Sequence, residues 1–339
     1  MFARHWKKIA VGLLLLIGLL LPVLVQNQYL LSVIMISYIW AIAVYGMNVL
    51  LGYTGQLSLA QAGFFGIGAY TVGIMTVTYE MSFWISLLAA VVVSSVVGFI
   101  VGLFALRTRN EYFAIFTLGV GLVIFLVIEN WQSFTGGRLG LIGVPYPEPL
   151  TELWQLYYLI LGFLVLTIYA VASISRSLVG RSFVAIRNSE ELAMATGINV
   201  GVNKQLAFVI STALAGLAGG LYAPNIGFLG PAVANIPTTF NMLLFLLVGG
   251  LGSLSGPLVG SLLVATLTQF LQQFQEYQLV IFGPLLVLVV IFFPKGIAGL
   301  LQSLETRFGN QPGPDDGQAE GPGEPADEES RAESTEEVR

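Results

Sequence analysis

The chain has 339 residues, of which 56% are hydrophobic and 10% charged, against roughly 25% charged in a soluble globular domain. So few charges cannot cover so much apolar surface in water, which excludes a water-soluble fold and makes lipid the solvent for most of the chain. With no cysteine, and with His5 as the single histidine, we expect no disulfide, metal site, cofactor or catalytic residue.

The net charge of −5 is unevenly distributed along the chain. Residues 309–339 hold ten acidic and two basic groups, whereas residues 1–308 hold nine acidic and twelve basic groups. The segment 309–339 is rich in Gly, Pro, Glu and Asp and cannot bury enough apolar surface to offset the entropy of ordering. We therefore expect a disordered acidic tail at 309–339, on the cytoplasmic side, behind a mildly basic membrane domain.

The chain begins with a charged stub, residues 1–8, which carries Arg4, Lys7 and Lys8 and is followed by an apolar run over 9–25. This pattern resembles a signal peptide. No small-x-small cleavage site follows the apolar run, which favours a first membrane span that is retained. We accordingly place a membrane domain at 9–308.

Further apolar segments follow, most of them near the roughly 20 residues that a helix needs to cross a bilayer. The segment 238–272 is too long for one span and too short for two with a loop, and GGLGSLSGP interrupts it at 249–257. This composition predicts a hairpin of two half-helices. The fold class expected is an all-α polytopic membrane protein; eight spans with a re-entrant hairpin and ten spans both remain open. The other segments are 29–51, 59–79, 83–106, 111–128, 153–175, 204–223 and 278–293.

Basic residues predict the orientation, because cytoplasmic loops carry an excess of Lys and Arg. A cytoplasmic N-terminus leaves only Arg138 outside, in the loop 129–152, and places the C-terminus inside. The basic residues then inside are Arg107, Arg109, Arg176, Arg181, Arg187, Lys204, Lys295 and Arg307.

Two glycine-rich interruptions are the first candidate functional elements. Polar groups at 52–63 (GYTGQLSLAQAG) are costly in lipid unless they face protein or water. One interpretation is a broken helix that lines a translocation path, and the other is a short cytoplasmic turn between two ordinary spans. The second interruption, at 249–256, occupies a comparable place in the second half, as internal-repeat transporters show. On the first interpretation the path residues are Asn48, Gln56, Ser58 and Gln61.

Small residues also recur at helix-packing spacing. Helices in lipid associate by close backbone approach through small side chains. The pairs are Gly98 with Gly102, Gly216 with Gly220, and Gly256 with Gly260.

The loop 176–203 is the longest basic loop of the membrane domain. Asn188 can N-cap a helix with Glu191 closing a capping box, and Gly197 can end it. The predicted helix, 189–196, is about 12 Å long at 1.5 Å per residue. Such a helix favours a docking element for a partner; the alternative is an amphipathic helix on the lipid headgroups.

Two absences from the sequence concern the source of energy. The chain contains no P-loop motif (Gly-x-x-x-x-Gly-Lys-Ser/Thr), so it does not hydrolyse ATP through one. No ionisable residue lies in the middle of a predicted span, and proton- and sodium-coupled carriers commonly use such groups. Transport energy is therefore expected from another subunit, and a self-sufficient channel or carrier is the less favoured alternative.

Several motifs, in order between about residues 30 and 300, resemble the permeases of branched-chain amino acid ABC importers, in particular the LivM-like branch. The matching stretches include Gly180-Arg181 through Ser211 and, listed by letters, GMNVLLGYTGQLSL at 46–59, FFGIGAY at 64–70, YFAI at 112–115, TGG…GL…VP within 135–145, and GGLGS…GP at 249–257. The chain departs from the family pattern at Ala60-Gln61, Asn110-Glu111 and Arg138-Leu139.

The resemblance implies a non-catalytic permease subunit in the inner membrane of a prokaryote. Its implied partners are a second related permease, two ATPase subunits and an extracytoplasmic binding protein. The implied substrates are branched-chain or related small amino acids, with urea or short-chain amides as the alternative, because their importers use closely similar permeases. The coupling loop would sit in a groove of an ATPase through Arg187, Glu190, Glu191, Ala195 and Gly197.

Overall fold

A computed structural model describes residues 18–22, 27–108, 111–150 and 152–271. The described part is built almost entirely of helices, which confirms the all-α prediction. The stub 1–8, the apolar segment 278–293 and the tail 309–339 lie outside the described residues, as does most of the first apolar run, 9–25. The number of spans in the whole chain therefore stays open.

Five described helices are long and apolar enough to cross a membrane, and they match the sequence prediction closely. Their lengths, from 20 residues in α5 to 27 in α10, reach the roughly 20 residues that the hydrocarbon core requires. They are α2 (Gln28–Met47, continued by the π-helical turn η1, Asn48–Tyr53), α4 (Phe83–Ala105), α5 (Glu111–Asn130), α7 (Leu153–Arg176) and α10 (Val200–Ile226). A sixth apolar helix, α3 (Gln61–Val77), is shorter and lies inside the bundle.

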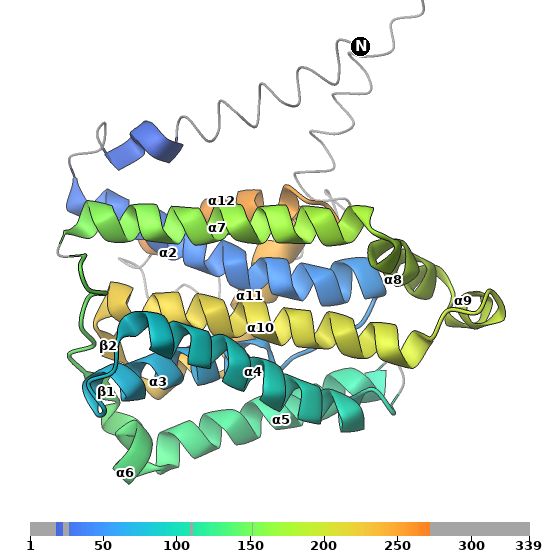
Figure 1. Cartoon of the computed structure of the whole chain (residues 1–339), viewed down its shortest axis with the longest axis horizontal. Coiled ribbons are helices and arrows are strands. Elements are labelled where there is room, and N and C mark those ends of the chain that lie inside the picture. Colours follow the sequence, from blue (N-terminus) through green and yellow to red (C-terminus); the bar gives the residue numbers. More distant parts are fainter. Residues whose placement is uncertain (1–17, 23–26, 109–110, 151, 272–339) are drawn as a thin grey trace, which may run out of the picture.

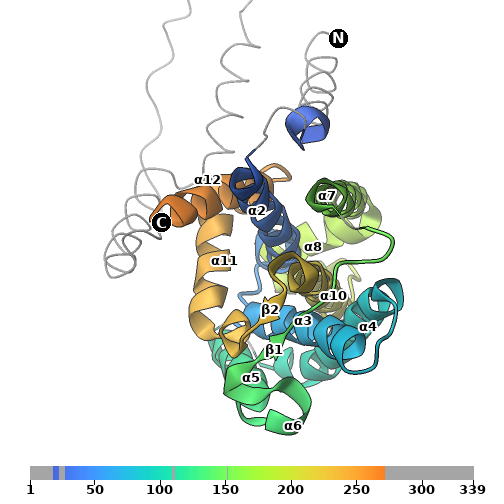
Figure 2. The same cartoon turned by 90° about the vertical axis from the view of Figure 1, so that its left-hand side faces the viewer.

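Helices α3 and α10 form the centre of the bundle (Figure 2). Helix α10 packs against α2, α3 and α4, and α5 and α11 contact α3 from the other side. The central helices approach closely because glycines face each other: a Cβ on Gly68 would collide with the backbone of Gly216, and one on Gly219 with Phe65. This is the close-approach packing expected of helices in lipid.

The predicted hairpin of half-helices is present. Helix α11 (Ile236–Gly249) and helix α12 (Gly256–Leu271) are short and pack against each other, and α12 also lies along α2. A Cβ on Gly249 would collide with Gly256, and a Cβ on Gly260 with the carbonyl of Phe245. Glycine at these positions is therefore what lets the two half-helices touch.

The two ends of the bundle carry different secondary-structure elements (Figure 1). One end carries α8 (Leu178–Asn188) and α9 (Glu190–Ala195). The other carries the short helices α6 (Gln132–Thr135), η2 (Gly137–Leu139) and η3 (Pro231–Ala234) and a two-stranded antiparallel sheet, β1 (Leu141–Ile142) with β2 (Phe228–Leu229). In the sheet, Leu141 faces Leu229 and Ile142 faces Phe228.

The predicted capping of the coupling helix by Asn188 is wrong by one residue. Asn188 is the last residue of α8, and Ser189 is the N-cap of α9, accepting from the backbone N–H of Leu192 at 3.3 Å. The sequence interpretation missed α8, which ends where Ser189 turns to extended backbone. Gly197 ends α9 at φ +85°, and the N–H of Ile198 returns to the carbonyl of Ala193, as in a Schellman motif.

Candidate functional site: the junction of two helix breaks

The first break follows η1, at the end of the bundle that carries α8. The wider π-helical winding at Asn48–Tyr53 replaces the last regular turn of α2, and Gly55 then adopts φ +75°. Side chains with a Cβ rarely adopt this conformation, whereas glycine does so at little cost. The chain leaves the helix here and reaches α3 through a non-helical segment, residues 55–60.

The second break, between α11 and α12, lies directly against the first. Asn48 is fully buried; its Nδ2 donates to the carbonyl of Ser253 at 2.9 Å, and its Oδ1 accepts from the N–H of Gly252 at 2.8 Å. The hydroxyl of Tyr45 donates to the carbonyl of Leu254 at 2.8 Å. Backbone groups freed by the second break are thus satisfied by side chains of α2 and η1, as buried backbone polar groups require.

Two glycines allow this contact. A Cβ on Gly52 would collide with the amide of Asn48 and lie 2.7 Å from the backbone nitrogen of Gly252. Gly252 itself adopts φ +71°. The two glycine-rich stretches that the sequence singled out separately therefore form one junction, defined by Asn48, Gly52, Gly55, Gly252 and Ser253.

Arg187, near the end of α8, reaches this junction. Its Nη1 donates to the carbonyl of Gly52 at 2.5 Å, and a Cβ on Gly252 would lie 2.9 Å from the same nitrogen. The side-chain stem crosses Gly55, where a Cβ would lie 3.3 Å from Cγ of Arg187. The residue remains exposed on its outer side. Arg187 was expected at an ATPase interface, and the contacts inside this chain were not foreseen.

Gln61 belongs to a separate polar cluster, at the start of α3. It is 1% exposed; its Nε2 donates to the carbonyl of Ala43 at 3.1 Å, and its Oε1 accepts from the hydroxyl of Ser211 at 3.1 Å. A Cβ on Gly46 would lie 2.7 Å from the carbonyl of Ser211. The amide of Gln61 thus joins α2, α3 and α10.

The other two expected path residues lie in the segment between the first break and α3. Gln56 and Ser58 are buried, and the hydroxyl of Ser58 accepts from the N–H of Ala60 at 3.4 Å. Of the four expected path residues, Asn48 lies in the junction, Gln61 in the separate polar cluster, and Gln56 and Ser58 in the segment between them. Their place on a translocation path stays a prediction.

Two of the three glycine pairs singled out for helix packing lie between α4 and α10, and the third lies between α11 and α12. A Cβ on Gly98 would collide with Thr212, and one on Gly216 with Ser94. A Cβ on Gly102 would lie 2.6 Å from Oε1 of Gln205, and one on Gly220 2.7 Å from Cδ1 of Leu87. These contacts run along the antiparallel crossing of the two helices.

The coupling segment carries an ion pair whose lysine is buried and whose glutamate is partly exposed. Glu190 on α9 pairs with Lys204 on α10, and Lys204 is 6% exposed. The sequence analysis counted Lys204 only as a cytoplasmic charge. Asn199, which caps α10, could have indicated that Lys204 lies in the early turns of a helix. Glu191 and Ala195 face outward, as do the apolar side chains of Leu192 and Met194. These exposed side chains form the outer face of α9.

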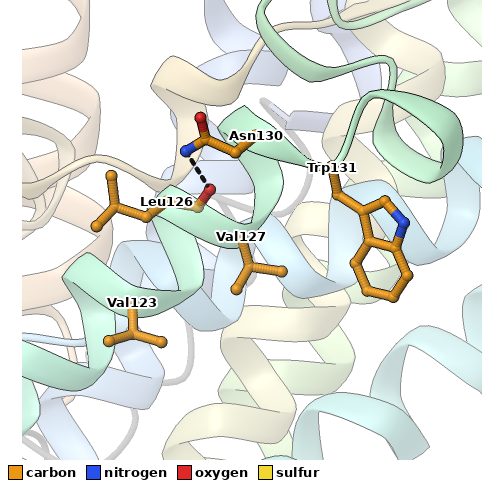
Figure 3. Close-up of a pocket in the computed structure, with 5 residues that line it drawn as sticks. All are labelled: Val123, Leu126, Val127, Asn130 and Trp131. Carbon is orange, nitrogen blue, oxygen red and sulfur yellow. Dashed lines mark hydrogen bonds between the residues drawn. The ribbon is translucent and has the colours of Figure 1, made fainter.

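Two surface hollows beside α5 are lined mainly by apolar side chains, unlike the polar junction. One is lined by Val123, Leu126, Val127, Asn130 and Trp131 (Figure 3), where the amide of Asn130 donates to the carbonyl of Leu126 at 2.9 Å within the same helix. The other is an apolar groove between α4 and α5. Such surfaces suit lipid acyl chains and offer little to a zwitterionic amino acid. Within the described ranges, no group of three His, Asp or Glu side chains could hold a metal ion.

Comparisons with known proteins agree on one family. The model of the family described as "Branched-chain amino acid transport system / permease component" matches residues 29–290. The high-affinity branched-chain amino acid transport system permease protein LivM of Salmonella typhimurium is 29% identical, over 86% of this chain and 75% of its own length. LivM of Escherichia coli is 29% identical over 77% and 68%, and BraD of Pseudomonas aeruginosa 26% identical over 80% and 95%. No solved structure matches this chain.

Proposed function

Since the chain belongs to the permease component family of branched-chain amino acid transport systems, we propose that it is the membrane-spanning subunit of an ATP-driven importer. Its cargo is a branched-chain or related small amino acid. The observation that carries this proposal is the family match across 29–290, which includes both helix breaks and the coupling segment. The similarity to LivM, LivH and BraD, all named as branched-chain amino acid permeases, supports the cargo.

The proposed energy source is a pair of separate ATPase subunits. The sequence has no P-loop, so ATP hydrolysis must come from another chain if it drives transport. The surface proposed for docking is α9 with its flanking residues, where Leu192, Met194 and Glu191 are exposed. A second related permease is proposed as the membrane partner, because this chain is similar to both LivM and LivH of the same organism.

The proposed orientation places the α8–α9 end in the cytoplasm of a prokaryote, with both termini on that side, and an extracytoplasmic binding protein at the end with β1 and β2. Five of the six basic residues in the described ranges lie at the α8–α9 end; only Arg138, paired with Glu129 at 3.2 Å, lies at the other. This asymmetry agrees with the positive-inside rule.

Uptake tests the cargo directly. The chain, co-expressed with the proposed second permease, ATPases and binding protein in cells lacking their own branched-chain amino acid importers, is expected to restore uptake of radiolabelled leucine, isoleucine or valine. Unlabelled urea and acetamide, added in excess, are expected to leave uptake unchanged. Uptake of labelled urea or amide in place of the amino acids would replace the proposed cargo with the alternative one.

Crosslinking tests the docking surface, and the absence of native cysteine makes single-cysteine variants unambiguous. Leu192→Cys and Met194→Cys are expected to crosslink to an ATPase subunit carrying a cysteine in its contact groove. Leu139→Cys, still more exposed but at the opposite end, is the control and is expected to give no product. Failure at every exposed position of α9 would exclude docking at this helix.

Single-cysteine variants also test the translocation path, because the chain has no native cysteine. Gln56→Cys and Ser58→Cys are expected to react with a water-soluble maleimide in one nucleotide state of the complex and to be protected in another. Leu126→Cys on the lipid-facing side of α5 is the control, expected to stay unreactive in all states. Equal protection of both path positions in every state would show that these residues only pack the bundle.

A further inference from the structure

We infer that Arg187 is the positioning residue that ties the coupling segment to both helix breaks, so that movement of α8 is passed to both breaks at once. The role of Arg187 in transport rests on the proposed ATP-driven function. The contacts of its side chain do not depend on that function.

The contacts of Arg187 join three separate parts of the chain. The residue belongs to α8, its Nη1 donates to the carbonyl of Gly52 in the first break, and the same nitrogen lies against Gly252 in the second break. Asn48 already holds the second break to η1 through two hydrogen bonds of 2.9 and 2.8 Å. One side chain therefore contacts the place where both broken segments meet.

The glycines provide the space that an arginine side chain needs here. Any side chain at Gly252 would press on the guanidinium, and one at Gly55 would press on the stem of Arg187. Both glycines also adopt positive φ, +71° and +75°, where other residues are disfavoured. Glycine at both breaks thus leaves the room that this one side chain occupies.

The chemistry of arginine suits this position. Its guanidinium is always charged, is planar and offers five N–H donors, so it can bond a carbonyl freed at a helix break and still lie flat against a neighbouring backbone. The last carbonyls of a helix carry a partial negative charge, which a cation stabilises. Gly52 is next to last in η1, so its carbonyl is such an acceptor.

Helix α8 connects directly to the proposed docking helix. Ser189 is both the C-cap of α8 and the N-cap of α9, and Glu190 on α9 pairs with the buried Lys204 on α10. A displacement of α9 therefore reaches α10 through Glu190 and Lys204 and reaches the two breaks through Arg187. Without the guanidinium of Arg187, the hydrogen bond to Gly52 and the contact with Gly252 are lost, and α8 keeps only backbone-level contacts with η1 and Gly55.

The test uses the assembled complex in proteoliposomes and compares Arg187→Ala with Arg181→Ala. Arg181 is an exposed arginine on the same helix, and its side chain makes no hydrogen bond or ion pair within the described residues. Arg187→Ala is expected to lower uptake about tenfold while ATP hydrolysis stays within about twofold of wild type, the size of a typical coupling effect. Arg181→Ala is expected to leave both unchanged, and Arg187→Lys, which keeps a donor and a stem, to recover part of the uptake.

A second readout does not depend on transport. In hydrogen–deuterium exchange of the complex, Arg187→Ala is expected to speed exchange in peptides covering 50–56 and 249–254, whereas Arg181→Ala leaves both peptides unchanged. Gly252→Ala, which crowds the guanidinium, is expected to reproduce the loss of uptake, and its effect should not add to that of Arg187→Ala.

Three results would overturn the inference. They are uptake and hydrolysis that fall together in Arg187→Ala, unchanged exchange at both breaks, or additive effects of the Gly252 and Arg187 variants. A wild-type complex that shows no ATP-driven uptake would remove the proposed function, while the exchange experiment would still decide whether Arg187 holds the two breaks together.

Discussion

The central and peripheral helices of this bundle are similarly apolar, yet they are buried to very different extents. In α2 and α10, 72% and 61% of the most apolar stretch is buried, against 28%, 22% and 22% in α4, α5 and α7. In water the most apolar helix would be the most buried; here α4 is largely uncovered because lipid is as apolar as its side chains. What distinguishes the centre is glycine and polar side chains, such as Gly68, Gly216, Asn48 and Gln61.

The largest effect that tests this comparison is expected at a central glycine. Gly68→Ala would drive a methyl group into the backbone of Gly216, so the free energy of unfolding should fall by about 3 kcal/mol, the upper part of the usual overpacking range. Gly119→Ala, on α5 with open space around it, is the matched control. It is expected to be neutral or to stabilise by up to about 1 kcal/mol through helix propensity. Unfolding in mixed micelles measures both, and equal losses would show that the centre is no more tightly packed than the periphery.

A smaller effect is expected at a buried polar residue. Asn48→Ala leaves the N–H of Gly252 and the carbonyl of Ser253 without their partner, which should cost about 2 kcal/mol of unfolding free energy. The same substitution at Asn130, an exposed residue at the end of α5, should cost less than about 0.5 kcal/mol. If the Asn48 variant were as stable as the Asn130 variant, the junction of the two breaks would not contribute to stability.

The smallest effect is expected on the lipid-facing surface. Leu126→Ala exchanges contacts with lipid for other contacts with lipid, so the unfolding free energy should change by less than about 0.5 kcal/mol. Leu221→Ala, on the fully buried face of α10, is the reference and should cost about 2–3 kcal/mol, the lower part of the usual range for opening a cavity. A large loss from Leu126→Ala would indicate that α5 contacts protein and not lipid at this position.

The same contrast explains which features the sequence could predict. Apolar length identified the spans that became α2, α4, α5, α7 and α10, and the glycine run at 249–257 identified the hairpin of half-helices. Both depend on properties local to the chain. Which helices lie at the centre depends on neighbours distant in sequence, and hydropathy carries no information about it in lipid.

The junction shows the same limit at the level of single residues. Gly52 and Gly252 were each recognised as parts of interruptions, but their contact through Asn48 joins residues about two hundred positions apart, and no local pattern encodes that pairing. Arg187 was recognised as a charge of the coupling loop, whereas its hydrogen bond to Gly52 depends on α8, which the sequence interpretation missed. The N-cap at Ser189 was missed for the same reason.

The most direct measurement of the central claim is amino-acid accumulation in proteoliposomes, made with this chain alone and with the chain assembled with its proposed permease, ATPase and binding-protein partners. Only the assembled complex is expected to accumulate labelled leucine, and only with hydrolysable ATP present. Accumulation against a gradient by the purified chain alone would contradict the account, because the bundle would then supply its own energy.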